Sequence, residues 1–155
     1  MRVDGGRAGP RRVVLLTVAL SLVATACVGP ALRDDDYRRK AVASLEQVAA
    51  TVAGVKIALD ASIDDRSFPT ATAVNVRRHE DTVAWAHTAF ATRQPPPGTD
   101  RIRAAVVPVL AEASSIMADV RIAANRTDRE ELREQRRRLD ELTGRLERVL
   151  GEVRG

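Results

Sequence analysis

The stretch AVASLEQVAATVAGVKIALDASI, residues 41–63, indicates the fold class of this chain. Its larger apolar residues recur every three or four positions, a spacing that places side chains on one face of an α-helix. These residues are Val42, Leu45, Val48, Val52, Val55, Leu59 and Ile63. The preceding acids Asp34, Asp35 and Asp36 suit the positive end of a helix dipole. We therefore expect a long helix from residue 34 to a break near residue 68.

Three later segments show the same helical period. The second runs from about residue 71 to residue 92, with Val76, His79, Val83, Ala86 and Phe90 on one face. The third carries Ile102, Val106, Val109, Ala113, Ile116, Val120 and Ala124. The fourth carries Leu132, Leu139, Leu142, Leu146, Val149 and Val153, close to a heptad. No segment alternates in the manner of a β-strand, so the pattern predicts only helices.

Short breaks separate these segments. Pro69 cannot continue a helix, and we expect Thr70 to cap the next one. Residues 94–98, Gln-Pro-Pro-Pro-Gly, stop any helix. Thr127 and Glu130 have the spacing of a capping box, in which each side chain bonds a free amide of the other residue. Since short connections make neighbouring helices reverse direction, the chain from residue 34 to residue 155 predicts an all-α, antiparallel up-down four-helix bundle.

Two details of these helices are also expected from the sequence. Pro108 lies inside the third pattern, where it removes a backbone hydrogen bond, so we expect a bend between residues 104 and 107. On the fourth helix, Glu134 with Arg138 and Glu141 with Arg145 stand four residues apart in the favourable orientation for ion pairs.

Net charge does not favour nucleic acid as a partner. The 155-residue chain has a formal charge of +4. Residues 1–26 hold four arginines and one aspartate, so +3 of that total belongs to them and about +1 to the rest. Acidic and basic residues are interleaved there, and we expect no nucleic-acid binding. The length fits one domain.

The first 26 residues have the layout of a secretory signal. A basic stretch ends at Arg12, an apolar run covers residues 13–23, and the small residues Ala24, Thr25 and Ala26 follow. Counted to Ala26, the apolar segment has 14 residues and as a helix would span about 21 Å, short of the roughly 30 Å hydrocarbon core of a bilayer. Cys27 comes next and is the only cysteine, so ordinary secretion would leave one unpaired thiol at the new N-terminus.

The stretch from Val23 to Cys27 resembles the lipobox of bacterial lipoproteins, although leucine is commoner in that family where Ala24 stands. The resemblance implies that the Cys27 thiol receives a diacylglyceryl group carrying chains such as palmitate. It also implies cleavage between Ala26 and Cys27. The expected organisation is a signal peptide over 1–26, a tether over 27–33 and the bundle over 34–155. The expected location is the extracytoplasmic face of the cell membrane, with the lipid as the membrane anchor.

Alternatives at this N-terminus stay open. The sequence Ala24-Thr25-Ala26 also suits a signal peptidase that releases a soluble product, and the leader could remain uncut. Arg11 and Arg12 suit either general secretion or twin-arginine export. The rest of the chain is similar to helical lipoproteins of actinobacteria at residues 37–41, Tyr-Arg-Arg-Lys-Ala, and 94–96, Gln-Pro-Pro. No activity can be carried over from that group to this chain.

Residues typical of catalysis or metal binding are sparse. His79 and His87 are the only histidines, about 80° apart around one helix, and no Glu-x-x-His pair of the kind found in di-iron bundles is present. There is no Gly-rich phosphate loop and no Gly-x-Ser-x-Gly elbow, and Ser114 and Ser115 have no base nearby in sequence. We expect no catalytic residue, no metal site and no cofactor. The alternative is an envelope enzyme or metal carrier built in the bundle core.

Two features remain as candidates for binding. Trp85 falls beside the apolar face of its helix, and we expect it to pack on the bundle, with exposure at a partner surface as the alternative. Arg136, Arg137 and Arg138 are flanked by acids and are interpreted as a solvated face. The sequence therefore predicts a membrane-anchored lipoprotein of unknown specific activity. Its bundle would act as a binding or scaffolding module, through a protein partner or self-association along helix faces.

Overall fold

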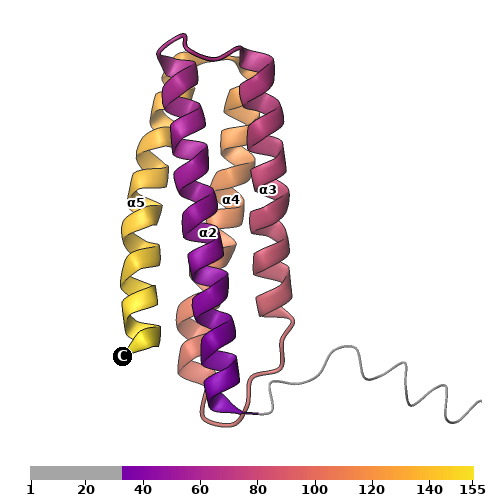
Figure 1. Ribbon diagram of the computed structural model, residues 1–155, viewed down its shortest axis with the longest axis vertical. Helices are drawn as coiled ribbons and strands as arrows, with labels where there is room; N and C mark the ends of the chain where they lie inside the picture. The colour runs from indigo at the N-terminus through magenta and orange to yellow at the C-terminus, as the bar shows by residue number, and fades with distance from the viewer. Residues whose placement is uncertain (1–32) are drawn as a thin grey trace, which may run out of the picture. The chain divides into compact units, whose positions relative to one another are not determined.

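The computed structural model describes residues 33–155, which form four helices and no strand (Figure 1). They are α2 (Asp34–Ile63), α3 (Pro69–Ala91), α4 (Asp100–Arg126) and α5 (Arg129–Arg154). The prediction of an all-α four-helix bundle is confirmed. The predicted leader, its cleavage site at Ala26 and the lipid-bearing Cys27 lie outside the described residues, as does the tether up to residue 32.

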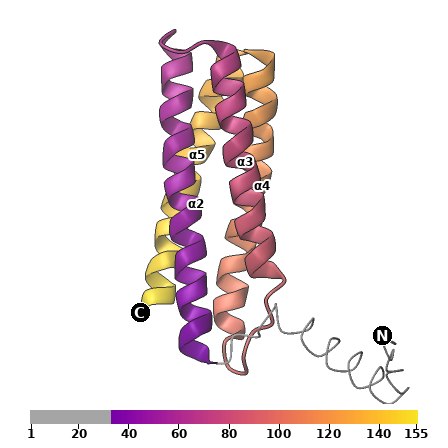
Figure 2. The same cartoon turned by 45° about the vertical axis from the view of Figure 1, so that its right-hand side comes forward.

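The four helices lie side by side around a single core (Figures 1 and 2). Helix α2 packs against α3 and α5, helix α4 packs against the same two, and α2 meets α4 more weakly across the core. Asp60 near the end of α2 pairs with Arg136 near the start of α5 at 2.9 Å. Glu46, earlier in α2, pairs with Arg154 at the end of α5. The two helices therefore run in opposite directions.

The apolar stripes read from the sequence form the core. Most of their members are buried, whereas Val42, Ile63, His79, Ile102 and Val149 are half-buried at its edge. The core also contains Tyr37, Leu110 and Met117, which the stripes did not include. The rings of Tyr37 and Phe90 pack at a centroid distance of 5.2 Å, which ties the start of α2 to the end of α3.

The predicted start of α3 is wrong by two residues. Phe68 occupies the N-cap position, Pro69 is the first helical residue, and Thr70 lies inside the helix. A proline suits the first turn, because the amide that it lacks would have no partner within the helix there. Pro69 therefore begins the helix that it was expected only to precede.

The capping box predicted at Thr127 is also wrong. Asp128 is the N-cap of α5, and its carboxylate accepts hydrogen bonds from the amides of Glu130 and Glu131 at 2.9 and 3.2 Å. Thr127 instead ends α4, with a left-handed φ of 56°. An aspartate accepts these bonds as well as a threonine does and adds a negative charge at the positive end of the helix.

Pro108 does not end α4, which continues on both sides of it. Its side chain lies on the exposed face of the helix, so its ring displaces no core residue.

Helix α2 is the one helix in residues 33–155 that is long and apolar enough to cross a membrane. Its inner face belongs to the bundle core, and Lys56 and Asp60 on its side form ion pairs with α5. Its apolar character also comes from its outer face, where Ala43, Ala50 and Ile57 are exposed. An apolar helix near the N-terminus is compatible with membrane association.

Candidate functional site

Ion pairs join neighbouring helices at three of the four seams of the bundle, a seam being the interface between two adjacent helices. Between α4 and α5, Arg138 reaches Asp119 at 2.7 Å and Arg145 reaches Glu112 at 2.6 Å. The α2–α5 seam has pairs at Lys56–Asp140, Arg136–Asp60 and Arg154–Glu46, and the α3–α4 seam has Arg121–Glu80. Among the described residues, no ion pair joins α2 to α3. That seam therefore differs chemically from the others.

The three consecutive arginines of α5 do not form a basic patch. Arg136 pairs with Asp60 and Asp140, Arg137 with Glu134, and Arg138 with Asp119. Because Arg136 and Arg138 lie at the edges of the helix, they bridge to α2 and α4 and are only partly solvated.

The ion pairs predicted within α5 are wrong. Arg138 pairs with Asp119 where Glu134 was expected, and Arg145 pairs with Glu112 where Glu141 was expected. In both cases the guanidinium selects a carboxylate of α4. Interhelical pairs of this kind help to set the relative positions of the two helices.

The carboxylate of Asp140 is the acceptor of a small network. Its pKa lies below the ordinary value, chiefly because Arg136 donates a hydrogen bond to it and secondly because Lys56 does so. The Lys56 ammonium lies 2.7 Å from this carboxylate. The hydrogen bond that Arg136 donates to Asp140 also raises the pKa of Arg136. The network links α2 to α5.

Replacing Asp140 by asparagine is expected to lower the free energy of unfolding at pH 7 by less than about 1 kcal/mol, since the carboxylate is half exposed. A carboxyl group whose pKa is depressed in the folded state stabilises the fold at pH values above its unfolded-state pKa of about 3.9. This stabilisation is lost as the pH falls through the folded-state pKa. The difference between wild type and D140N should therefore be constant from pH 5 to pH 8 and decrease progressively in urea titrations as the pH falls below about 4. The exposed neighbour Glu141→Gln is the control; a pH-independent loss in D140N would contradict the prediction.

The two histidines do not lie in a metal cluster. His79 is half-buried, with Nδ1 2.8 Å from the carbonyl oxygen of Asn75. A side chain at Gly54 of α2 would bring its Cβ to 3.3 Å from His79 Nε2, so the glycine allows α3 to approach closely. Over residues 33–155, no three or more His, Cys, Asp or Glu side chains lie together as metal ligands would. The hydroxyl of Ser114 donates to the carbonyl oxygen of Leu110 at 3.2 Å.

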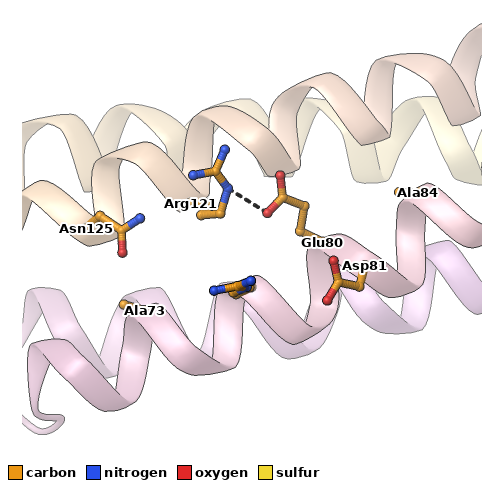
Figure 3. Close-up of a pocket in the computed structure, with 7 residues that line it drawn as sticks. Ala73, Glu80, Asp81, Ala84, Arg121 and Asn125 are labelled. Carbon is orange, nitrogen blue, oxygen red and sulfur yellow. Dashed lines mark ion pairs between the residues drawn. The ribbon is translucent and has the colours of Figure 1, made fainter.

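A cavity lies between α3 and α4, and we call it the α3–α4 pocket (Figure 3). It has a volume of about 490 Å³ and is half open to solvent. Its lining residues are Ala73, Arg77, Glu80, Asp81, Ala84, Arg121 and Asn125. Sequence reasoning missed this pocket, because no motif marks it.

A second, smaller concavity of about 190 Å³, the α2–α3 groove, lies on the seam without ion pairs. It is lined from α2 by Lys40, Ala43, Ser44 and Gln47, and from α3 and the residues after it by Trp85, Ala86, Ala89, Phe90 and Arg93. Trp85 is 65% exposed, so the expectation that it packs on the bundle is wrong and the alternative of an exposed ring is correct. The small residues of α2 opposite it leave a shallow floor that cannot cover an indole.

The α2–α3 groove has a basic end. Lys40 and Arg93 line it together, and the Nε atom of Arg93 is buried with no hydrogen-bond partner in the described part of the chain. A buried donor without an acceptor costs free energy, and the two basic side chains make this end of the groove positively charged.

Comparison with known proteins adds no family: no family model, curated protein or solved structure matches this chain.

Proposed function

We propose that this protein is an extracytoplasmic lipoprotein, held at the cell membrane by acyl chains on Cys27, whose helical bundle binds another protein of the cell envelope. The anchor rests on the sequence of residues 1–27. The binding role rests on one observation above all, the exposed Trp85 at the only helix seam that lacks ion pairs in the described residues.

An exposed tryptophan in this position suits protein binding. Tryptophan is enriched among the residues that contribute most to interfaces, because its large ring buries much apolar area with little loss of side-chain freedom. Ile57 lies on the outer face of α2 and is 71% exposed. Together with the exposed Ala43 and Ala50, it extends the apolar surface beside the groove along α2.

The partner that fits the α2–α3 groove is an acidic amphipathic helix. Small residues on the floor, such as Ala43 and Ala89, allow a third helix to approach at a helix-packing distance of about 8–10 Å. Its apolar side would cover Trp85, and a carboxylate would pair with the ammonium of Lys40 and the guanidinium of Arg93. The positive charge at this end of the groove thus selects an acidic partner.

The anchor also restricts where this partner resides. Lys40 lies about 10 Å along α2 from Arg33, and the tether before Arg33 reaches about 20 Å even when fully extended. The basic end of the groove would then stay within a few tens of ångströms of the membrane. The partner is therefore a membrane-bound or membrane-proximal envelope protein.

Site-specific photo-crosslinking in living cells tests the proposal. A photoreactive residue at Ala89, in the groove, is expected to crosslink an envelope protein, and one at the exposed Arg133 of α5 is not. Mass spectrometry of the crosslinked peptide should identify an acidic helical segment of the partner. Crosslinks to a second copy of this chain, to lipid alone, or equally from both positions would overturn the proposed partner.

Replacing Trp85 by alanine is expected to reduce the crosslink from Ala89 at least tenfold while changing the free energy of unfolding by no more than about 0.5 kcal/mol. The exposed ring contributes little to the core, so folding and binding separate here. Val74→Ala, an exposed apolar residue on the same helix outside the groove, is the matched control and should retain the crosslink. A crosslink that W85A leaves intact would show that the groove does not bind the partner.

A further inference from the structure

The α3–α4 pocket is lined by two charged residues of each sign and by small side chains. Ala73 and Ala84 bound it on α3 and leave the space that larger residues would fill. Figure 3 shows Asn125 and Ala73 at one end, Asp81 and Ala84 at the other, and the ion pair of Arg121 with Glu80 between them. The volume of about 490 Å³ lies within the range of small-molecule sites.

The central ion pair forms a fixed side of the pocket. Arg121 Nε lies 2.7 Å from a carboxylate oxygen of Glu80, and the Glu80 side chain is mostly buried. This pair joins α3 to α4, the two helices that form the walls of the pocket. The charges of the pair largely balance each other and leave the other charged residues to recognise a ligand.

Arg77 and Asp81 are the two charged lining residues outside the central ion pair. They stand four positions apart on α3 and both line the pocket, yet they form no ion pair with each other or with any other side chain in residues 33–155. One turn of helix separates them by about 6 Å along the axis. The side-chain amide of Asn125 lies on the opposite wall.

From this arrangement we infer that the α3–α4 pocket binds a small zwitterion of the amino-acid class. The ligand carboxylate accepts hydrogen bonds from the guanidinium of Arg77 and the amide of Asn125, and the ligand ammonium donates to the carboxylate of Asp81. An α-amino acid carries its ammonium and its carboxylate on the same carbon. With a hydrogen bond of about 3 Å at each end, they span a donor and an acceptor that lie one helical turn apart.

The charge balance selects this class over simple ions. An anion alone would leave Asp81 without a partner, and a cation alone would leave Arg77 without one, whereas a zwitterion pairs with both. The inference depends on neither the lipid anchor nor the α2–α3 groove. It can therefore be tested independently of the proposed function.

Ligand-observed NMR on the full-length chain tests the site. Each of the standard L-amino acids is titrated separately, and the same compounds with an acetylated amine or an amidated carboxylate are the matched ligands. At least one free amino acid is expected to bind saturably, with affinity at least tenfold above that of both its blocked forms. The absence of saturable binding by every free amino acid would overturn the inference, as would equal binding of the blocked forms.

Variants assign the two charges. Arg77→Gln and Asp81→Asn should each weaken binding of the free amino acid about tenfold, the usual effect of losing one charge-assisted hydrogen bond. D81N should not weaken the N-acetyl derivative further, because that ligand has no ammonium. Arg78→Gln changes the exposed neighbour outside the pocket and should leave affinity unchanged. Unfolding midpoints like that of wild type verify that the variants fold, and unchanged affinity in both R77Q and D81N would contradict the assignment.

Discussion

Cys27→Ser is expected to abolish acyl labelling of the protein and to leave its leader uncut. In the lipoprotein family that residues 23–27 resemble, the thiol is the only atom that receives the diacylglyceryl group, and cleavage follows that step. Each buried methylene contributes about 0.8 kcal/mol, so two long chains make the membrane attachment effectively permanent. Metabolic labelling with a palmitate analogue, followed by intact mass measurement of the protein from membranes, checks both results.

Val28→Ser is the matched control, because it adds the same hydroxyl next to the site and keeps the thiol. This variant should be labelled and cleaved like wild type. Wild-type protein found in the medium with a free thiol, or label that persists in C27S, would contradict the anchor and leave the bundle without its proposed location.

Phe90→Ala is expected to lower the free energy of unfolding by about 3–5 kcal/mol, a large share of the 5–15 kcal/mol typical of a domain. The Phe90 ring is buried against Tyr37, where α2 and α3 close one end of the core. The expected loss of stability combines the free energy of transferring the ring from the core to water with the cost of the cavity that it leaves. Urea unfolding followed by circular dichroism measures it.

The other phenylalanine of the chain supplies the control. Phe68 is 83% exposed in the link before α3, so Phe68→Ala should change stability by no more than about 0.5 kcal/mol. Equal losses in F68A and F90A would contradict the core described above.

Tyr37→Phe tests the same end of the core from the other side. The Tyr37 hydroxyl is buried and forms no hydrogen bond within residues 33–155. Removing it relieves a desolvated polar group, so Y37F should leave stability unchanged or raise it by up to about 1 kcal/mol. A clear loss of stability in Y37F would show that the hydroxyl has a partner such as a bound water.

The helices and most of the core follow from local spacing. Every three-to-four-residue stripe from Val42 to Val153 lies in a helix, because the helical period is a property of each segment alone. The caps are less predictable from the sequence. Thr127 and Asp128 are both good capping residues, and the choice between them depends on where α4 ends.

The candidate sites depend on which helices are neighbours. The spacing of residues within one helix carries no information about this. Arg138 and Arg145 have acids at the right distance on their own helix, but α4 presents Asp119 and Glu112 to them. Trp85 lies at the edge of its apolar face, where only the size of the facing α2 residues decides its exposure. The α3–α4 pocket likewise requires that Ala73 and Ala84 face Arg121.

The left-handed Thr127 has a consequence for how this chain can rearrange. A β-branched residue at a φ of 56° is strained by roughly 1–2 kcal/mol, and the strain disappears if Thr127 adopts ordinary helical angles. If Asp128, which is extended at φ −85° and ψ 111°, became helical as well, α4 and α5 would merge into one long rod, and α5 would be free to complete the bundle of another chain by domain swapping. The folded-back arrangement is therefore maintained by the leucines that α5 packs against α2 and α4, against the local preference of the turn.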